Sequence, residues 1–113
     1  MRTKLVEKYN AVVIELKGNV MGGEDTKEFT ETLHKLIDEG KLNVIVDLSA
    51  VKFMNSSGLG MLISGLTTMK RANGSLKLAN VTDKIESLLI ITKLITIFES
   101  YESVDEAVKS IAE

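Results

Sequence analysis

The 113-residue sequence contains no cysteine and no proline, and its only histidine is His34. Without cysteine the chain forms no disulfide, thiolate metal site or cysteine nucleophile, which favours a reducing compartment and a cytoplasmic location. Because proline is absent, glycine and asparagine must supply the breaks between elements. A hydrolase needs a base, but His34 falls on the polar side of a predicted helix, where we interpret it as a solvated surface residue.

Also missing are a long apolar run and a stripe of basic residues. No segment approaches the roughly 18 apolar residues of a membrane span. The first ten residues, MRTKLVEKYN, carry scattered charges, unlike a signal peptide. Charges of both signs are mixed along the chain, with a formal net charge of -2. We therefore expect neither a membrane nor nucleic acid as a partner.

What the sequence does contain is the composition of a globular domain, with 44% apolar and 27% charged residues. This length suffices for one domain, which we expect to span residues 1–113. A chain of this size buries roughly 60–70% of the surface that it exposes when unfolded, so a hydrophobic core is sufficient to hold it together.

Apolar periodicity predicts an initial hairpin followed by alternating helices and strands. The strands are predicted at residues 4–8, 11–17, 44–48, 75–79 and 96–100. The helices are predicted at 25–40, 57–72 and 82–92, with a last one after residue 103. Two helix starts carry a capping box, Asp25 with Glu28 and Ser103 with Glu106.

Strands that alternate with helices pair in parallel through right-handed crossovers, and the initial hairpin adds an antiparallel edge strand. The sequence therefore predicts an α/β fold with a mixed β-sheet of mostly parallel strands.

The most informative stretch joins a buried strand to a helix at residues 46–62, VDLSAVKFMNSSGLGML. Asn55, Ser56 and Ser57 are all types that cap helices, since a short polar side chain accepts from free backbone N–H groups. Gly58 and Gly60 each cost a helix about 1 kcal/mol against alanine. We interpret them as clearing the surface around the serines for another macromolecule.

A phosphate on Ser56 suits this position. The amino end of a helix is electrostatically positive, and phosphorylation adds about -1.5 to -2 charges with strong acceptor oxygens. The fold should tolerate this group, whereas a tight interface would have to desolvate the dianion. Ser56 can then switch a contact without unfolding the domain; the alternative is that the serines only cap the helix.

This stretch resembles the signature of bacterial anti-sigma factor antagonists, the single-domain STAS proteins. The resemblance rests on Asp47-Leu48-Ser49, Val51 and Phe53-Met54-Asn55-Ser56-Ser57-Gly58-Leu59-Gly60, and the order of strands and helices agrees over nearly the whole chain. It implies a STAS fold, a right-handed βα superhelix, and a regulatory binding protein that is not an enzyme.

The resemblance also implies a site and its partners. In that family the first serine of the pair, here Ser56, is phosphorylated by an anti-sigma factor that is itself a serine kinase. The unphosphorylated antagonist captures this anti-sigma factor and frees the sigma factor. The phosphorylated form releases it, and a metal-dependent serine phosphatase removes the phosphate. The expected partner-binding residues are Met21, Gly22, Gly23, Asn55, Ser56, Ser57 and Gly58.

Two positions depart from the family pattern. Asn55 stands where aspartate usually precedes the phosphorylated serine. Met21 replaces the aspartate of a Gly-x-Leu-Asp motif, so the acidic residues of that loop come later, at Glu24 and Asp25. These departures leave open a constitutive STAS scaffold that docks a partner without phosphorylation.

Other chemistries lack their motifs. Met54 occupies the first glycine of a Gly-x-Ser-x-Gly nucleophile elbow. The Gly58-x-Gly60 pair lacks the remaining glycine of a dinucleotide fingerprint and the lysine of a P-loop. Asp47 has no histidine or cysteine to complete a metal site. We expect no catalytic residue, metal or cofactor; nucleotide binding, reported for some STAS domains, has no phosphate-cradling motif here.

Overall fold

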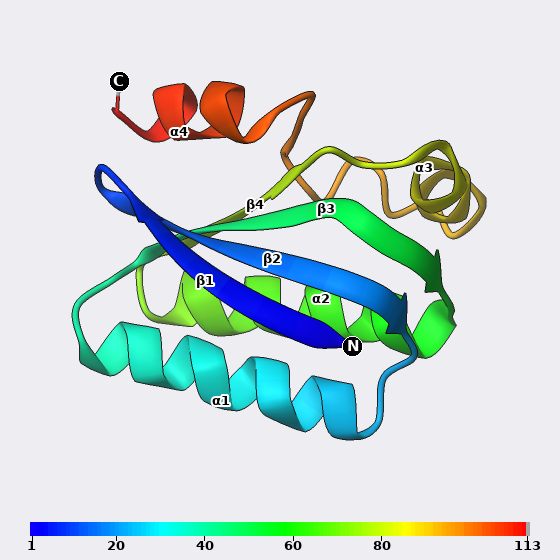
Figure 1. The fold of residues 1–113 in the computed structure, drawn as a ribbon, viewed down its shortest axis with the longest axis horizontal. Coiled ribbons are helices and arrows are strands. Elements are labelled where there is room, and N and C mark those ends of the chain that lie inside the picture. Colours follow the sequence, from blue (N-terminus) through cyan, green and yellow to red (C-terminus); the bar gives the residue numbers. More distant parts are fainter. Residues whose placement is uncertain (113) are drawn as a thin grey trace.

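A five-stranded sheet carries α1 and α2 on one face and α4 on the other, while α3 lies beside the carboxyl end of β3 (Figure 1). This computed structural model describes residues 1–112. The strands are β1 (Arg2–Lys8), β2 (Ala11–Val20), β3 (Asn43–Met54), β4 (Ser75–Ala79) and β5 (Ser100–Tyr101). The helices are α1 (Glu24–Asp38), α2 (Ser56–Arg71), α3 (Asp83–Ile91) and α4 (Val104–Ala112).

The strands lie in the order β1-β2-β3-β4-β5. β1 runs antiparallel to β2, and each later pair is parallel, which confirms the predicted mixed α/β sheet. Because β2 and β3 are parallel, the loops that follow them leave the sheet at the same edge. This arrangement brings the loop after Val20 next to the segment after Met54.

Side chains of β2 alternate between two cores. Val12, Ile14 and Leu16 pack with α1 and α2, whereas Ala11 and Val13 face α4. A strand buried on both faces needs this continuous apolar run. The helices bury the faces that their periodicity predicts, through Phe29, Leu33, Leu36, Leu59, Leu62, Met69, Ile85 and Leu89. None of the helices within residues 1–112 has the length and apolar character needed to cross a bilayer.

β3 continues past its predicted end at residue 48 as far as Met54. Its pairing with β2 shifts register between Glu15 and Lys17 and again between Gly18 and Asn19. Each shift places an extra residue in β3 and interrupts the alternation of buried and exposed side chains. The second half of the strand therefore has no period-two pattern, which is why the sequence predicted a connection there.

The predicted capping box of Asp25 and Glu28 is wrong. α1 begins at Glu24, and its N-cap residue is Gly23, which makes no side-chain capping bond. The Asp25 carboxylate turns back toward the preceding loop, where it accepts from the Met21 N–H at 3.4 Å. Its other oxygen lies 3.6 Å from the amino-terminal nitrogen.

The last strand, β5, is shorter and later than predicted. The chain ahead of it forms turns, in which the Ile97 N–H donates to the Leu94 carbonyl at 3.0 Å. Half of the capping box that follows is confirmed, because the Ser103 hydroxyl oxygen accepts from the Glu106 N–H at 3.1 Å. The Glu106 carboxylate accepts from the Glu102 N–H at 3.3 Å instead of from the Ser103 N–H.

Candidate functional site

The start of α2 presents Ser56 on the surface. Asn55 is the N-cap residue, with extended backbone angles (φ -100°, ψ -177°), and its Oδ1 accepts from the Gly58 N–H at 2.8 Å. Ser56 is the first residue of the helix, and both Ser56 and Ser57 are exposed, while Asn55 is half-buried. Because Asn55 caps the helix, the Ser56 hydroxyl is not needed for capping.

Two glycines fix the loop after β2 against the start of α2. A Cβ at Gly22, where φ is +82°, would lie 2.7 Å from the Ser57 Cβ. A Cβ at Gly58 would lie 2.1 Å from the Val20 carbonyl oxygen. Neither position has room for a side chain, so the two segments touch through their backbones. The exposed serines are therefore carried on a closely packed junction.

The structure corrects the role predicted for Gly58. Gly58 is buried, and the backbone that approaches it belongs to β2 of the same chain rather than to a partner. Gly60 is exposed, and a Cβ there would meet nothing within 4 Å, so it does leave open surface near Ser56. Gly22 is buried as well. Of the predicted partner-binding residues, the exposed ones are Met21, Gly23, Ser56 and Ser57.

The surface around Ser56 is partly apolar. Met21 is 45% exposed and Phe53 is 49% exposed. The first turn of α2 contains no acidic side chain, and its last turn contains Lys70 and Arg71, which complement the helix dipole. A phosphate on Ser56 would thus meet the positive end of the helix and no carboxylate from that turn.

The structure also places the histidine and the aspartate that the sequence raised as candidates for chemistry. His34, on α1, is exposed. Asp47 acts as a structural acceptor, because its Oδ1 accepts from the Ser49 N–H and from the Asn80 side-chain amide, both at 3.0 Å. Within residues 1–112, no group of three or more histidine, cysteine, aspartate or glutamate residues is placed to hold a metal ion.

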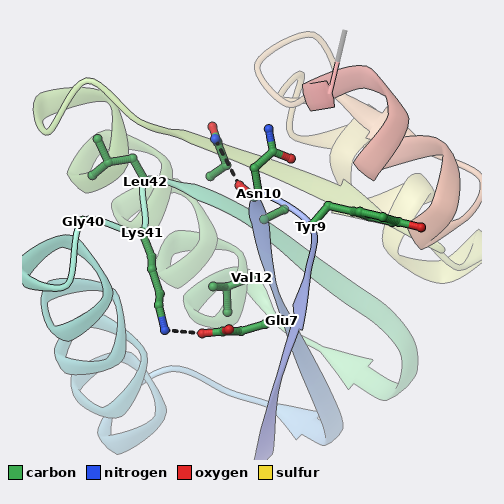
Figure 2. A pocket seen from close by; sticks show the side chains of 9 residues that line it. Glu7, Tyr9, Asn10, Val12, Gly40, Lys41 and Leu42 are labelled. Atoms are coloured by element: carbon green, nitrogen blue, oxygen red, sulfur yellow. Dashed lines mark hydrogen bonds and ion pairs between the residues drawn. The ribbon is translucent and has the colours of Figure 1, made fainter.

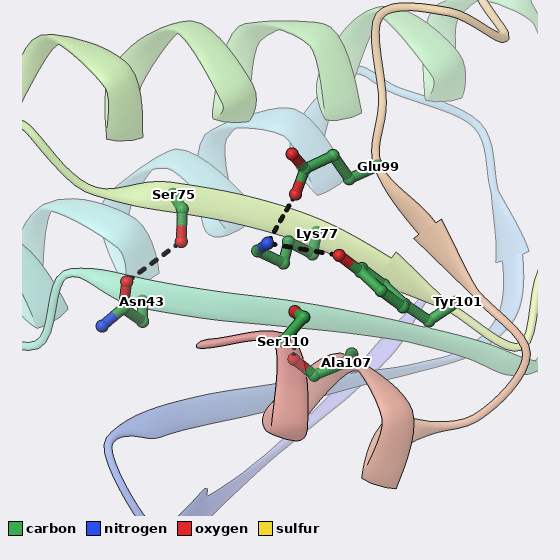
Figure 3. Close-up of polar contacts among 7 residues, drawn as sticks. All are labelled: Asn43, Ser75, Lys77, Glu99, Tyr101, Ala107 and Ser110. Atoms are coloured by element: carbon green, nitrogen blue, oxygen red, sulfur yellow. Dashed lines mark hydrogen bonds and ion pairs between the residues drawn. The ribbon is translucent and has the colours of Figure 1, made fainter. Parts of the chain in front are cut away.

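Shifted pKa values occur at the far edge of the sheet, where Lys77 of β4 donates to Glu99 and to the Tyr101 hydroxyl (Figure 3). Burial alone would lower the pKa of Lys77, but these hydrogen bonds outweigh it and raise the pKa. The hydrogen bond from Lys77, with its positive charge, lowers the pKa of Glu99. These contacts connect β5 to the sheet and do not reach Ser56.

A depression of about 370 Å³ lies at the amino ends of β2 and β3, the opposite edge of the sheet from Ser56 (Figure 2). Lys41 points across it and donates to Glu7, and this hydrogen bond raises the pKa of Lys41. Tyr9 points away from the pair. The depression is therefore separate from the candidate site.

A groove that the sequence did not predict adjoins the site. It lies between the end of β3 and one side of α3, has a volume of about 230 Å³, and is lined by Phe53, Met54 and Ile91 among others. The signal in the sequence was the run LLII at residues 88–91, which is more apolar than one buried helix stripe requires. Helical spacing predicts a buried stripe of Ile85, Leu88 and Leu89, and Ile90 and Ile91 fall outside it.

Comparison with known proteins shows the family to which the chain belongs. Residues 2–107 match the family model of the STAS domain. An anti-sigma-B factor antagonist of Staphylococcus aureus is 31% identical over 78 residues, which cover 66% of this chain and 72% of that protein. The crystal structure of TM1081 from Thermotoga maritima superposes with a TM-score of 0.83 at 21% identity, covering 99% of this chain and 94% of that one.

The Bacillus cell fate determinant SpoIIAA, in its phosphorylated form, superposes with a TM-score of 0.73 at 19% identity, covering 97% of this chain and 99% of that one. The chain belongs to the STAS domain family. Within that family it is of the anti-sigma factor antagonist type, which confirms the resemblance seen in the sequence.

Proposed function

We propose that the protein is a phosphorylation-gated anti-sigma factor antagonist whose phosphorylated residue is Ser56. The observation that carries the proposal is the exposed Ser56 at the first position of α2, beside a cap supplied by Asn55. In the unphosphorylated form, the surface around Ser56 binds an anti-sigma factor serine kinase and frees the sigma factor. A metal-dependent serine phosphatase restores this form. These partners act on the antagonist in the cytoplasm.

The chemistry of the site explains how one phosphate can act on binding alone. On the free protein the dianion faces solvent and the positive end of α2, which costs the fold little. In the complex the same dianion would be enclosed beside Met21 and Phe53, and desolvating it would oppose association. Phosphorylation therefore changes the affinity for the partner and leaves the domain folded.

The first test locates the phosphate. The protein is incubated with ATP and the serine-kinase anti-sigma factor of the source organism, and the product is analysed by intact mass and peptide mapping. We expect one phosphate on Ser56 and none on Ser56→Ala. Ser57→Ala is the control for the position of the phosphate and should still carry it on Ser56, whatever its rate of labelling. Phosphate on Ser57, or no phosphate at all, would contradict the assignment.

The second test measures gating. By titration calorimetry, Ser56→Ala should bind the anti-sigma factor as tightly as the unphosphorylated protein, and Ser56→Asp should bind at least about tenfold more weakly, a difference of about 1.4 kcal/mol. The expected cause is the desolvation of the introduced carboxylate. Equal affinities of the two variants would show that charge at this position does not control binding.

A constitutive scaffold is the second candidate, and Asn55 and Met21 favour it because they replace the two aspartates of the family pattern. In that case the same surface docks a partner and carries no phosphate. Phosphate analysis of the protein purified from its native host separates the two functions. Protein that lacks phosphate under every growth condition, yet still binds the anti-sigma factor, would support the scaffold.

A further inference from the structure

We infer that the groove between the end of β3 and α3, called here the β3–α3 groove, is a second contact site for the partner that binds around Ser56. It would receive an apolar side chain of that partner flanked by carboxylates. This inference rests on the proposed function, since it extends the surface around Ser56. Its apolar lining consists of Phe53, Met54, Ile85, Leu88 and Ile91, and Lys52 and Lys84 also line it.

Two side chains of the apolar lining are unusually open to solvent, while Met54 and Ile85 beneath them are buried. Ile91 is 78% exposed and Phe53 is 49% exposed, although side chains of this size are usually buried. Exposed apolar surface with a polar rim marks interaction sites. The volume, about 230 Å³, is below the roughly 300–1,000 Å³ of small-molecule pockets. It suits an inserted side chain better than a separate organic ligand.

The charges at the groove are positive. On α3, Lys84, Leu88 and Ile91 share the face that borders the groove, since residues four and seven positions apart lie on one side of a helix. The acidic residues of this helix, Asp83 and Glu86, fall on other faces and do not line the groove.

Lys52 adds a second positive charge from the end of β3. Within residues 1–112, neither Lys52 nor Lys84 lies within 4.0 Å of a carboxylate oxygen. Two unpaired ammonium groups beside an apolar depression are complementary to a segment in which acidic residues flank a large apolar one. The net charge of the whole chain is -2, so this positive pair is a local feature.

The groove is continuous with the Ser56 surface. Met54, which lines the groove, directly precedes the Asn55 cap, and Asn55 directly precedes Ser56. Figure 1 shows α3 on the same side of the molecule as the carboxyl ends of β2 and β3. A partner large enough to cover Ser56 and Met21 therefore reaches the groove.

A positively charged apolar surface could also contact an anionic lipid bilayer. The observations favour a protein partner, because the apolar residues line a depression between two elements and do not form a protruding face. The two outcomes are separated in the test below by a vesicle assay.

The test uses Ile91→Ser and the double variant Lys52→Glu/Lys84→Glu. Their controls are Ile97→Ser, an isoleucine that is 43% exposed and lies outside the groove, and Lys35→Glu on exposed α1 surface. All these side chains are solvent-accessible, and circular dichroism checks that each variant is folded. Titration calorimetry then gives the Kd of each unphosphorylated protein for the serine-kinase anti-sigma factor.

We expect Ile91→Ser and the charge-reversal variant each to weaken binding by about tenfold, and both controls to stay within about twofold of the wild type. The charge reversal should also reduce the dependence of Kd on salt.

If the wild type binds, Ser56→Asp does not, and the groove variants bind like the wild type, the groove inference fails while the proposed function stands. No binding by the wild type overturns both. The vesicle assay measures whether the protein sediments with phosphatidylglycerol vesicles. If the wild type does and the groove variants do not, while all of them bind the kinase equally, the groove contacts a lipid surface and the protein-docking inference is overturned.

Discussion

Gly58 and Gly60 are two residues apart in α2, but their surroundings are opposite. A Cβ at Gly58 would lie 2.1 Å from the Val20 carbonyl oxygen and 2.9 Å from its carbon, both of them backbone atoms of β2. A Cβ at Gly60 would meet nothing within 4 Å. The sequence alone cannot distinguish the two positions, because it identifies each as glycine without showing which atoms lie next to it. Only the first is required by packing.

Gly58→Ala should therefore destabilise the protein by about 1–3 kcal/mol, because the added methyl group must separate the start of α2 from β2. Gly60→Ala is the matched control and should stabilise it by roughly 0.5–1 kcal/mol, since alanine is the better helix former and its methyl group enters open space. Urea unfolding followed by circular dichroism measures both changes. Equal midpoints for the two variants would contradict the contact with Val20.

At the scale of elements, α2 depends on its cap. Asn55→Ala removes the acceptor for the Gly58 N–H and should cost about 1 kcal/mol of stability. Asn55→Asp restores the residue usual in the family, keeps the cap and adds a negative charge at the positive helix end, worth roughly 0.3–1 kcal/mol. In thermal unfolding, the Tm of Asn55→Asp should be higher than that of the wild type, and the Tm of Asn55→Ala should be lower. A stable Ala variant would show that another group caps this helix.

β5 is only two residues long, and the Lys77–Glu99 contact supports its attachment to β4. The pKa of Glu99 is lowered by the hydrogen bond from Lys77. The hydrogen bond therefore stabilises the folded state fully at pH values above 4.5, the ordinary pKa of this carboxyl group. This stabilisation is lost as the pH falls through the lowered pKa. Because the Glu99 side chain is 65% exposed, we expect the contact to add only roughly a few tenths of a kcal/mol to the free energy of unfolding.

An NMR titration of the Glu99 carboxyl group checks this prediction directly. The wild type should titrate below 4.5, and Lys77→Met should bring the pKa back toward that ordinary value. The stability difference between the wild type and Glu99→Gln should be present at neutral pH and absent in strong acid. An unchanged Glu99 pKa in the Lys77 variant would show that another group lowers it.

Elements with a strong periodic signal were predictable from the sequence, and irregular ones were not. β4 has the predicted bounds, and the Ser103–Glu106 cap is present, because both depend on local residues. β3 was underestimated, since its bulges interrupt the alternation that identifies a strand. At the site, hydroxyls and glycines identified the helix start. The β3–α3 groove was not predicted, because it depends on how α3 packs beside β3.

At the scale of the whole molecule, the parallel order of β2 and β3 explains why one edge of the sheet carries the candidate site. Their carboxyl ends bring Met21 and Ser56 together, although 35 positions separate them in the sequence, and the groove adjoins Ser56 through Met54. Another depression, around Lys41, lies at the other edge. Ser56 is exposed and belongs to neither of the two cores on either side of the sheet, so a charge placed on its side chain need not disturb them.

This separation predicts that Ser56→Asp loses partner binding without losing stability. The carboxylate enters the first turn of α2, where interaction with the helix dipole is worth roughly 0.3–1 kcal/mol, so Tm should stay constant or rise by about 1–4 °C at low salt. Added salt should reduce any rise, because the new charge is exposed to screening. Ser64→Asp, an exposed position further along the same helix, is the control and should show no rise. A clear fall in the Tm of Ser56→Asp alone would mean that charge at this position loosens the fold, and its loss of binding could then no longer be attributed to the surface.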